Sequence, residues 1–143
     1  MCRIGAVTAL VVLQRSCFAL SHYENPPCQA DEVQGEVLGQ SGYTCSPRCD
    51  ANYNCVADMP PGSSATPQCM LQDVDKGAFC GLVCQVDAQC PSGATCKQNS
   101  QMGIGLCMYA ASFADWARSA TTRKLALGWP SKGGSLESAQ VAK

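Results

Sequence analysis

The run Cys45-Ser-Pro-Arg-Cys49-Asp-Ala-Asn-Tyr-Asn-Cys55 returns in outline 35 residues later as Cys80-Gly-Leu-Val-Cys84-Gln-Val-Asp-Ala-Gln-Cys90. Both runs space their cysteines by three and then by five residues, which predicts two related units over 45–69 and 80–107. Cysteines at such a density in a short chain more often hold a fold together than act as reagents. We therefore expect a small disulfide-rich domain.

The N-terminus has the parts of a secretory signal peptide, which we place at residues 1–21. Arg3 precedes an apolar stretch over 4–13, and small residues follow near Ala19 and Ser21. The apolar stretch is shorter than the roughly 20 residues that a membrane-spanning helix needs. Cleavage after Ala19 and cleavage after Ser21 both fit this pattern. In either case we expect a secreted, extracellular protein.

Disulfide pairing follows from the number of cysteines that the signal peptide leaves behind. Removing residues 1–21 takes away two of the 12 cysteines, and an even number remains for an oxidising compartment. The cysteines expected to form disulfides are Cys28, Cys45, Cys49, Cys55, Cys69, Cys80, Cys84, Cys90, Cys96 and Cys107. With Cys28 counted in the first unit, each unit holds five of them, so at least one bridge must join the units. Ten cysteines allow about 945 pairings; for the second unit we expect the interleaved pair Cys84–Cys96 and Cys90–Cys107.

The body of the chain is poor in large apolar residues and rich in turn signals. Proline and glycine interrupt it about every ten residues. We expect a short hairpin of 70–72 and 78–83 around a turn at 73–77, a strand at 106–109 and a weaker one at 33–38. An N-terminal extended segment over 22–44 precedes the cysteine-rich domain at 45–109. The predicted fold class is small and disulfide-rich, with irregular loops, short β-hairpins and one C-terminal α-helix.

The composition changes after Cys107, and residues 110–128 are typical of an amphipathic helix. Ser112-Phe-Ala-Asp115 begins like a capping box. Helical spacing is followed by Phe113, Trp116, Ala117, Ala120 and Leu127. Gly128 and Pro130 form a stop signal, so we predict a helix over 112–127 whose Phe113 and Trp116 pack on the disulfide body. The alternative is contact of helix 112–127 with an anionic membrane. Residues 129–143 lack apolar content and are expected to be disordered.

Two stretches carry a resemblance to known extracellular proteins. Cys84-Gln-Val-Asp-Ala-Gln-Cys90-Pro-Ser-Gly-Ala-Thr-Cys96, followed by Gly105-Leu-Cys107, resembles Dickkopf-type N-terminal and EB-type modules. Ala65-Thr-Pro-Gln-Cys69-Met-Leu-Gln-Asp73, with the second unit after it, resembles secreted cysteine-rich repeat proteins of dinoflagellate-like algae. The resemblance covers roughly residues 45–109. It implies a fold style and an extracellular setting, and it brings no catalytic residues to this chain.

Charge is distributed unevenly along the chain. Residues 22–107 carry three basic against nine acidic side chains (net −6), whereas 108–143 carry five basic against two acidic (net +3). An acidic body is not typical of nucleic-acid-binding proteins. We therefore predict no nucleic-acid partner.

The chain offers little for catalysis, and we predict no catalytic residue, metal or cofactor. Its single histidine, His22, lies at the expected mature N-terminus, where we expect a solvated, frayed residue. Zinc held by thiolates from both cysteine runs is disfavoured, because secreted thiols oxidise. The run Asp73-x-Asp75-x-Gly77 resembles the start of a calcium loop, but its glycine comes one position early and Cys84 stands at the twelfth. A hairpin turn is the simpler interpretation. We expect the carboxylates of Asp31, Glu32 and Glu36 to be solvated.

These observations favour a secreted, non-enzymatic binding or adhesion module, which we expect to be a monomer that contacts an extracellular protein or glycan. One alternative is a protease inhibitor whose reactive segment is Met59-Pro60-Pro61. A second is a small secreted effector or toxin that acts through the basic helix.

Overall fold

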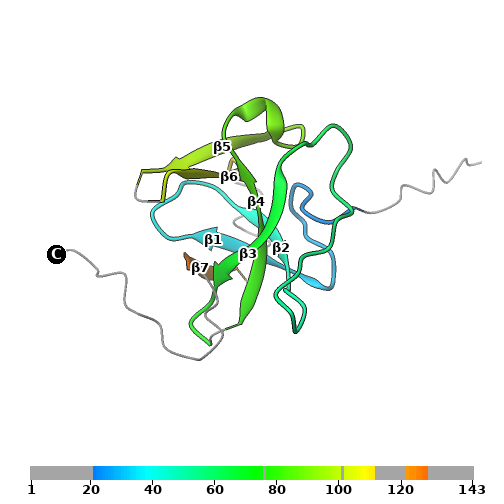
Figure 1. The fold of residues 1–143 in the computed structure, drawn as a ribbon, viewed down its shortest axis with the longest axis vertical. Coiled ribbons are helices and arrows are strands. Elements are labelled where there is room, and N and C mark those ends of the chain that lie inside the picture. The colour runs from blue at the N-terminus through cyan, green and yellow to red at the C-terminus, as the bar shows by residue number, and fades with distance from the viewer. Residues whose placement is uncertain (1–20, 76, 101, 112–121, 129–143) are drawn as a thin grey trace, which may run out of the picture.

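The structure, a computed structural model, describes residues 21–75, 77–100, 102–111 and 122–128. Seven strands form one curled sheet in the order β2-β1-β7-β3-β4-β6-β5, with β5 and β6 at the top of the view in Figure 1 and β7 at the lower left. The strands are β1 (Glu32–Val37), β2 (Thr44–Pro47), β3 (Thr66–Gln72), β4 (Ala78–Cys84), β5 (Ala94–Asn99), β6 (Ile104–Tyr109) and β7 (Arg123–Leu127). The 3-10 turn η1 (Asp87–Gln89) precedes β5.

Three hairpins, β1–β2, β3–β4 and β5–β6, make up most of the sheet. Each places opposite one another two residues that are eleven apart in the sequence. These pairs are Gln34 and Cys45, Cys69 and Cys80, and Cys96 and Cys107. The predicted hairpin around the turn at 73–77 is confirmed as β3–β4. The strand expected at 106–109 lies within β6, and the one expected at 33–38 overlaps β1, which ends at Val37.

The second strand of each hairpin continues onto the next hairpin. Just past the end of β2, Arg48 pairs with Phe79 of β4, and Val83 of β4 pairs with Leu106 of β6. Tyr109 at the end of β6 pairs with Tyr43, directly before β2. The three hairpins therefore close into a ring, and this closure explains why a sheet with so few large side chains encloses a core.

Five disulfides join the ten cysteines of the described residues. They are Cys28–Cys45, Cys49–Cys69, Cys55–Cys80, Cys84–Cys96 and Cys90–Cys107. The bridge expected between the two units is Cys55–Cys80, and both pairs expected within the second unit are present. The interleaved pattern also occurs one hairpin earlier, where Cys49–Cys69 crosses Cys55–Cys80.

The core has two parts with different chemistry. One is rich in sulfur and contains Tyr23, Ala65 and Leu82 among buried cysteines. The other is apolar and consists of Val37, Met70, Leu71, Phe79, Leu106, Met108 and Leu125. The small apolar part agrees with the sparse apolar composition, because disulfides supplement a core of this size.

The predicted C-terminal helix is wrong where the structure describes it. Arg123–Leu127 is the strand β7, parallel to β1 and antiparallel to β3. Its central residue Leu125 is 0% exposed and belongs to the apolar core, while Arg123 and Lys124 are exposed. A five-residue strand that fills the gap between two other strands gains two hydrogen-bonded neighbours, which outweighs a weak local preference for helix.

The described residues contain no α-helix, so the β-hairpins and loops of the predicted fold class stand without its helix. The rest of that prediction, including Phe113 and Trp116, falls on residues 112–121, outside the described part. Residues 1–20 and 129–143, the expected signal peptide and tail, lie outside it as well. No helix in the described ranges is long and apolar enough to cross a membrane.

Candidate functional site

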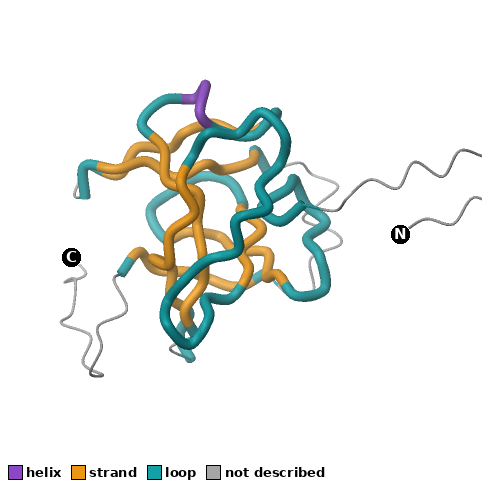
Figure 2. The backbone as a smooth tube through the Cα atoms, turned by 45° about the vertical axis from the view of Figure 1, so that its right-hand side comes forward, coloured by secondary structure: helices purple, strands orange, loops and turns teal. Residues whose placement is uncertain are grey.

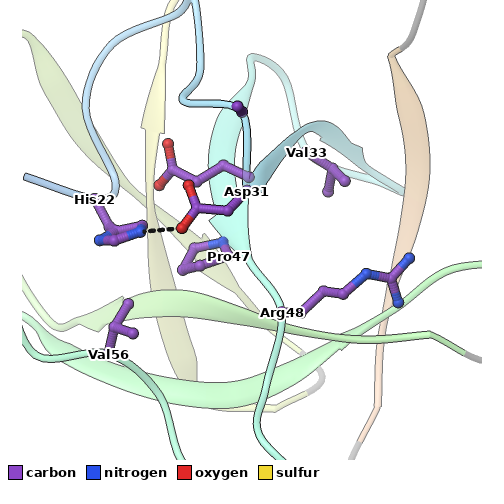
Figure 3. A pocket seen from close by; sticks show the side chains of 8 residues that line it. His22, Asp31, Val33, Pro47, Arg48 and Val56 are labelled. Atoms are coloured by element: carbon purple, nitrogen blue, oxygen red, sulfur yellow. Dashed lines mark hydrogen bonds and ion pairs between the residues drawn. The ribbon is translucent and has the colours of Figure 1, made fainter.

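An open pocket of about 480 Å³ lies where the N-terminal segment meets the loop after β2. Its lining residues are His22, Ala30, Asp31, Glu32, Val33, Pro47, Arg48 and Val56. Figure 3 shows His22 and Arg48 at opposite ends, with Pro47 between them and Val33 and Val56 on opposite sides. The pocket therefore combines apolar walls with charged groups, His22 and Asp31 toward one end and Arg48 at the other.

His22 forms one end of this pocket, held between two carboxylates. Its Nδ1 lies 2.8 Å from both oxygens of Asp58, and its Nε2 lies 3.0 Å from Oδ2 of Asp31. Burial lowers the pKa of His22, but the hydrogen bonds to Asp31 and Asp58 outweigh it and raise the pKa above 6.5. Only 14% of the side chain is exposed, so the expectation of a frayed, solvated histidine is wrong. Asp58 is 36 residues away in the sequence, so no local sequence pattern predicts its contact with His22.

The carboxylate of Glu32 holds the N-terminal segment in place through backbone hydrogen bonds. Its carboxylate accepts hydrogen bonds from the backbone N–H groups of Tyr23 (2.7 Å) and Gln29 (3.0 Å). Burial raises the pKa of Glu32, and these hydrogen bonds offset only part of that effect. Tyr23 itself donates its hydroxyl to the carbonyl of Val56, and its own carbonyl accepts the hydroxyl of Tyr109. Glu32 is thus a buried structural carboxylate and not the solvated group expected.

Arg48 forms the other end of the pocket. Its guanidinium carbon lies 4.9 Å from the centre of the Phe79 ring, an arrangement that orients the cation without neutralising it. It forms no ion pair with any residue that the structure describes. The side chain is exposed, so its charge is open to a ligand.

The loop from Cys49 to Cys55 is fixed at both ends and braced from inside. Cys49 is bonded to Cys69 and Cys55 to Cys80. Asp50 Oδ1 accepts the backbone N–H groups of Asn52 (2.8 Å) and Asn54 (2.7 Å), and the hydrogen bonds from Asn54 lower the pKa of Asp50 most.

At the tip of this loop, Tyr53 has a φ of 62° and is 37% exposed. A positive φ is costly for a residue other than glycine, and such strain clusters at functional sites. Val56, directly after the loop, is 40% exposed and lines the pocket. Figure 2 shows loop backbone gathered along one side of the strands. The sequence did not predict a role for Tyr53, which stands two residues before Cys55 of the repeated run.

Only the last residue of the segment proposed as a protease-reactive loop is exposed. Met59 is half-buried and packs on the sulfur-rich core, Pro60 is buried, and Pro61 is exposed. A reactive segment has to present its side chain to a protease cleft. This geometry therefore weakens the inhibitor hypothesis.

The residues weighed as metal ligands have other partners. Asp73 Oδ1 accepts the backbone N–H groups of Asp75 and Gly77, and its Oδ2 lies 2.6 Å from Arg123, so this run is the predicted hairpin turn. The sulfurs of Cys45, Cys49, Cys80 and Cys84 all belong to disulfides, and a disulfide sulfur is not a thiolate ligand.

The site offers ionic and apolar contacts to a ligand. Both ring nitrogens of His22 are engaged by carboxylates, so neither is free to act on a ligand as a general base. Comparison with family models, with curated proteins and with solved structures finds no match to this chain.

Proposed function

We propose that the chain is a secreted, non-enzymatic binding module whose partner is an extracellular protein held by the loop Cys49–Cys55 and the adjoining pocket. The five disulfides fit a small stabilised module of extracellular type. The observation that carries the proposal is the exposed Tyr53 at the tip of a loop with a bridge at each end.

The loop is suited to binding because its ordering cost is met during folding. Two bridges and the Asp50 hydrogen bonds fix its backbone before any partner arrives. Preorganisation of this kind increases affinity by removing entropy that would otherwise be lost on binding. Tyrosine is a preferred anchor in such loops, since it offers a large rigid contact area with few rotatable bonds.

The neighbouring side chains complete a contact surface of mixed character. Val56 adds apolar area, Arg48 adds an unneutralised positive charge, and Asp31 is 70% exposed on its side chain. An apolar centre with charges at its rim is the usual composition of a protein–protein contact. The partner that fits this surface best is an extracellular protein with a protruding apolar side chain and a carboxylate that pairs with Arg48.

Site-specific photocross-linking tests the proposal directly. We would replace Tyr53 by p-benzoylphenylalanine and irradiate the folded chain in extracellular material, with the same replacement at Val86, which is 57% exposed, as the control. The expected result is a discrete protein adduct at position 53 that excess unlabelled chain abolishes and that is absent at position 86. Equal adducts at both positions, or no competable adduct at 53, would refute the proposal.

Once the adduct identifies a partner, its affinity gives a second readout. Tyr53→Ala should weaken binding by about 2 kcal/mol, or about 30-fold, as for a typical tyrosine anchor. Val86→Ser changes another exposed apolar side chain outside the proposed contact surface and should leave the affinity unchanged. A Tyr53→Ala variant that is folded and binds as tightly as the parent chain would remove Tyr53 from the site.

A further inference from the structure

The first hairpin lacks a tie that the other two possess. Cys49 and Cys84 stand six residues before Cys55 and Cys90, and each is bonded to the first of the two opposed cysteines in its hairpin. In the first hairpin, the position six residues before Cys28 is His22 and the opposed position is Gln34. The bridge Cys28–Cys45 is present. The second bridge of the other hairpins has no counterpart here, because His22 and Gln34 stand at its two positions.

Glu32 occupies the place of the missing sulfur. One of its carboxylate oxygens lies within 4.8 Å of the sulfurs of Cys28 and Cys45. In the later hairpins the sulfurs of Cys49 and Cys84 hold the same position beside their neighbouring bridges. The carboxylate accepts the N–H group of Tyr23, before Cys28, and that of Gln29, directly after it. The segment before Cys28 is therefore held by a hydrogen bond where the other hairpins have a covalent bond.

His22 adds the contact that reaches across to the next loop. Asp31 belongs to the N-terminal segment, whereas Asp58 comes from the loop after Cys55. The other groups that face the imidazole are the Glu32 carboxylate and the ring of Tyr23, whose centre is 6.4 Å away, with Arg48 at the far end of the pocket. The imidazole is therefore a titratable link between two segments that no bridge joins directly. It acts beside two hydrogen bonds that do not titrate with it, from the His22 N–H to the Asp58 carbonyl (3.0 Å) and from the Tyr23 hydroxyl to the Val56 carbonyl (2.9 Å).

We propose that His22 is a proton-controlled latch, whose imidazolium joins Asp31 to Asp58 and holds the N-terminal segment closed against the loop that follows Cys55. An imidazolium donates from both nitrogens, whereas a neutral imidazole has one donor and one acceptor. A carboxylate has no proton to donate, so the neutral ring keeps one of the two aspartates and releases the other. Loss of the proton thus loosens the His22 wall of the pocket by one side-chain contact, while the hydrogen bonds to the Asp58 and Val56 carbonyls remain.

The direction of the pH effect follows from the contacts. The pKa of His22 is raised above 6.5 in the folded chain, so its stabilising contribution is fully present below 6.5 and is lost as the pH rises through the folded value. The latch is closed in acid and opens on the alkaline side. This behaviour is intrinsic to the chain and does not depend on the proposed binding function.

The chain has a single histidine, so its imidazole C–H signals in an NMR titration are unambiguous. We expect a titration midpoint above 6.5, and backbone amide signals of Tyr23 and Asp58 that shift with the same midpoint. The amide of Lys97, in β5, serves as the unaffected reference. A midpoint at or below 6.5, or Tyr23 and Asp58 signals that ignore the titration, would overturn the latch.

Two variants distinguish a latch from an ordinary surface histidine. Asp58→Asn keeps the shape of the side chain but removes the charge, so the midpoint of the His22 titration should fall. The backbone amide signal of residue 58 should no longer shift with that titration. Asp75→Asn, an acid-to-amide change on a side chain that is 81% exposed, is the matched control and should leave the midpoint unchanged. Equal effects of the two variants would refute the proposal.

Discussion

Cys69 and Cys80 lie opposite one another across β3 and β4, yet they are not bonded to each other: Cys69 is bonded to Cys49 and Cys80 to Cys55. Both strands of the hairpin are thereby tied to the two ends of one loop. The same relationship holds for Cys96 and Cys107, which are bonded to Cys84 and Cys90. The disulfides thus anchor loops on hairpins and leave the hairpins to their backbone hydrogen bonds.

Removal of the bridge between the two predicted units should cost somewhat more than removal of the shortest bridge. Cys55–Cys80 spans 25 residues, whereas Cys84–Cys96 spans 12. A longer closed loop restricts the unfolded chain more, and both losses are expected near 3 kcal/mol. We expect the double variant Cys55→Ala/Cys80→Ala to unfold at a lower guanidinium concentration than Cys84→Ala/Cys96→Ala. The reverse order would show that this bridge is not the main tie between the units.

Substitution of Leu125 tests the strand that replaces the predicted helix. Leu125 is fully buried among the apolar core residues, so Leu125→Ala should lower the free energy of unfolding by about 2–5 kcal/mol. In a helix over 112–127, Leu125 would lie away from the face that carries Leu127 and would matter little. The exposed neighbour Ala126 is the control, and Ala126→Ser should change stability by less than about 0.5 kcal/mol. Chemical denaturation of the three chains measures both values.

The sequence was informative where its signals are local. The turn at 73–77 is bounded by strands that face each other, and the spacing of Cys84, Cys90, Cys96 and Cys107 was enough to suggest their pairing. Because each unit holds an odd number of cysteines, at least one bridge had to join the units, and that bridge is Cys55–Cys80. Each of these inferences needs only neighbouring residues or a count.

Contacts between separate segments could not be predicted from the sequence, for a physical reason. β7 is a strand because β1 and β3 leave a place between them, and its residues taken alone favour a helix. His22 is held by Asp31 and Asp58, and Glu32 by the backbone of Tyr23 and Gln29. Neither contact is marked by a periodicity or a motif, because its partners come together only through the folded course of the N-terminal segment and of the loop after Cys55.

Acid should destabilise the chain through Asp73. Burial raises the pKa of Asp73, but hydrogen bonds from the Gly77 backbone and from Arg123 outweigh it and hold the pKa below 3.8. The stability that the ionised group contributes is therefore present above 3.8 and is lost as the pH falls through the folded value.

Arg123→Ala should consequently move the acid-unfolding midpoint to higher pH. The change removes the 2.6 Å contact with a carboxylate whose side chain is only 3% exposed, at a cost of about 1–3 kcal/mol near neutral pH. Lys124→Ala, at an exposed neighbour, is the control and should leave the midpoint in place. Circular dichroism against pH measures it, and identical curves for the two variants would contradict the role assigned to the ion pair.

Gly42 tests the closure of the three hairpins into a ring. It has a φ of +114°, and a methyl group there would overlap the carbonyl oxygen of Tyr109, whose backbone exchanges hydrogen bonds of 2.9 and 2.8 Å with Tyr43. Gly39 also has a positive φ, +78°, but open space around it. Gly39→Ala should therefore cost about 1 kcal/mol, the price of the backbone conformation alone, and Gly42→Ala distinctly more. Faster amide exchange at Tyr109 in Gly42→Ala, with normal exchange in Gly39→Ala, would locate the extra loss at the junction of β6 and β2. Equal losses in the two variants would mean that this junction does not hold the ring closed.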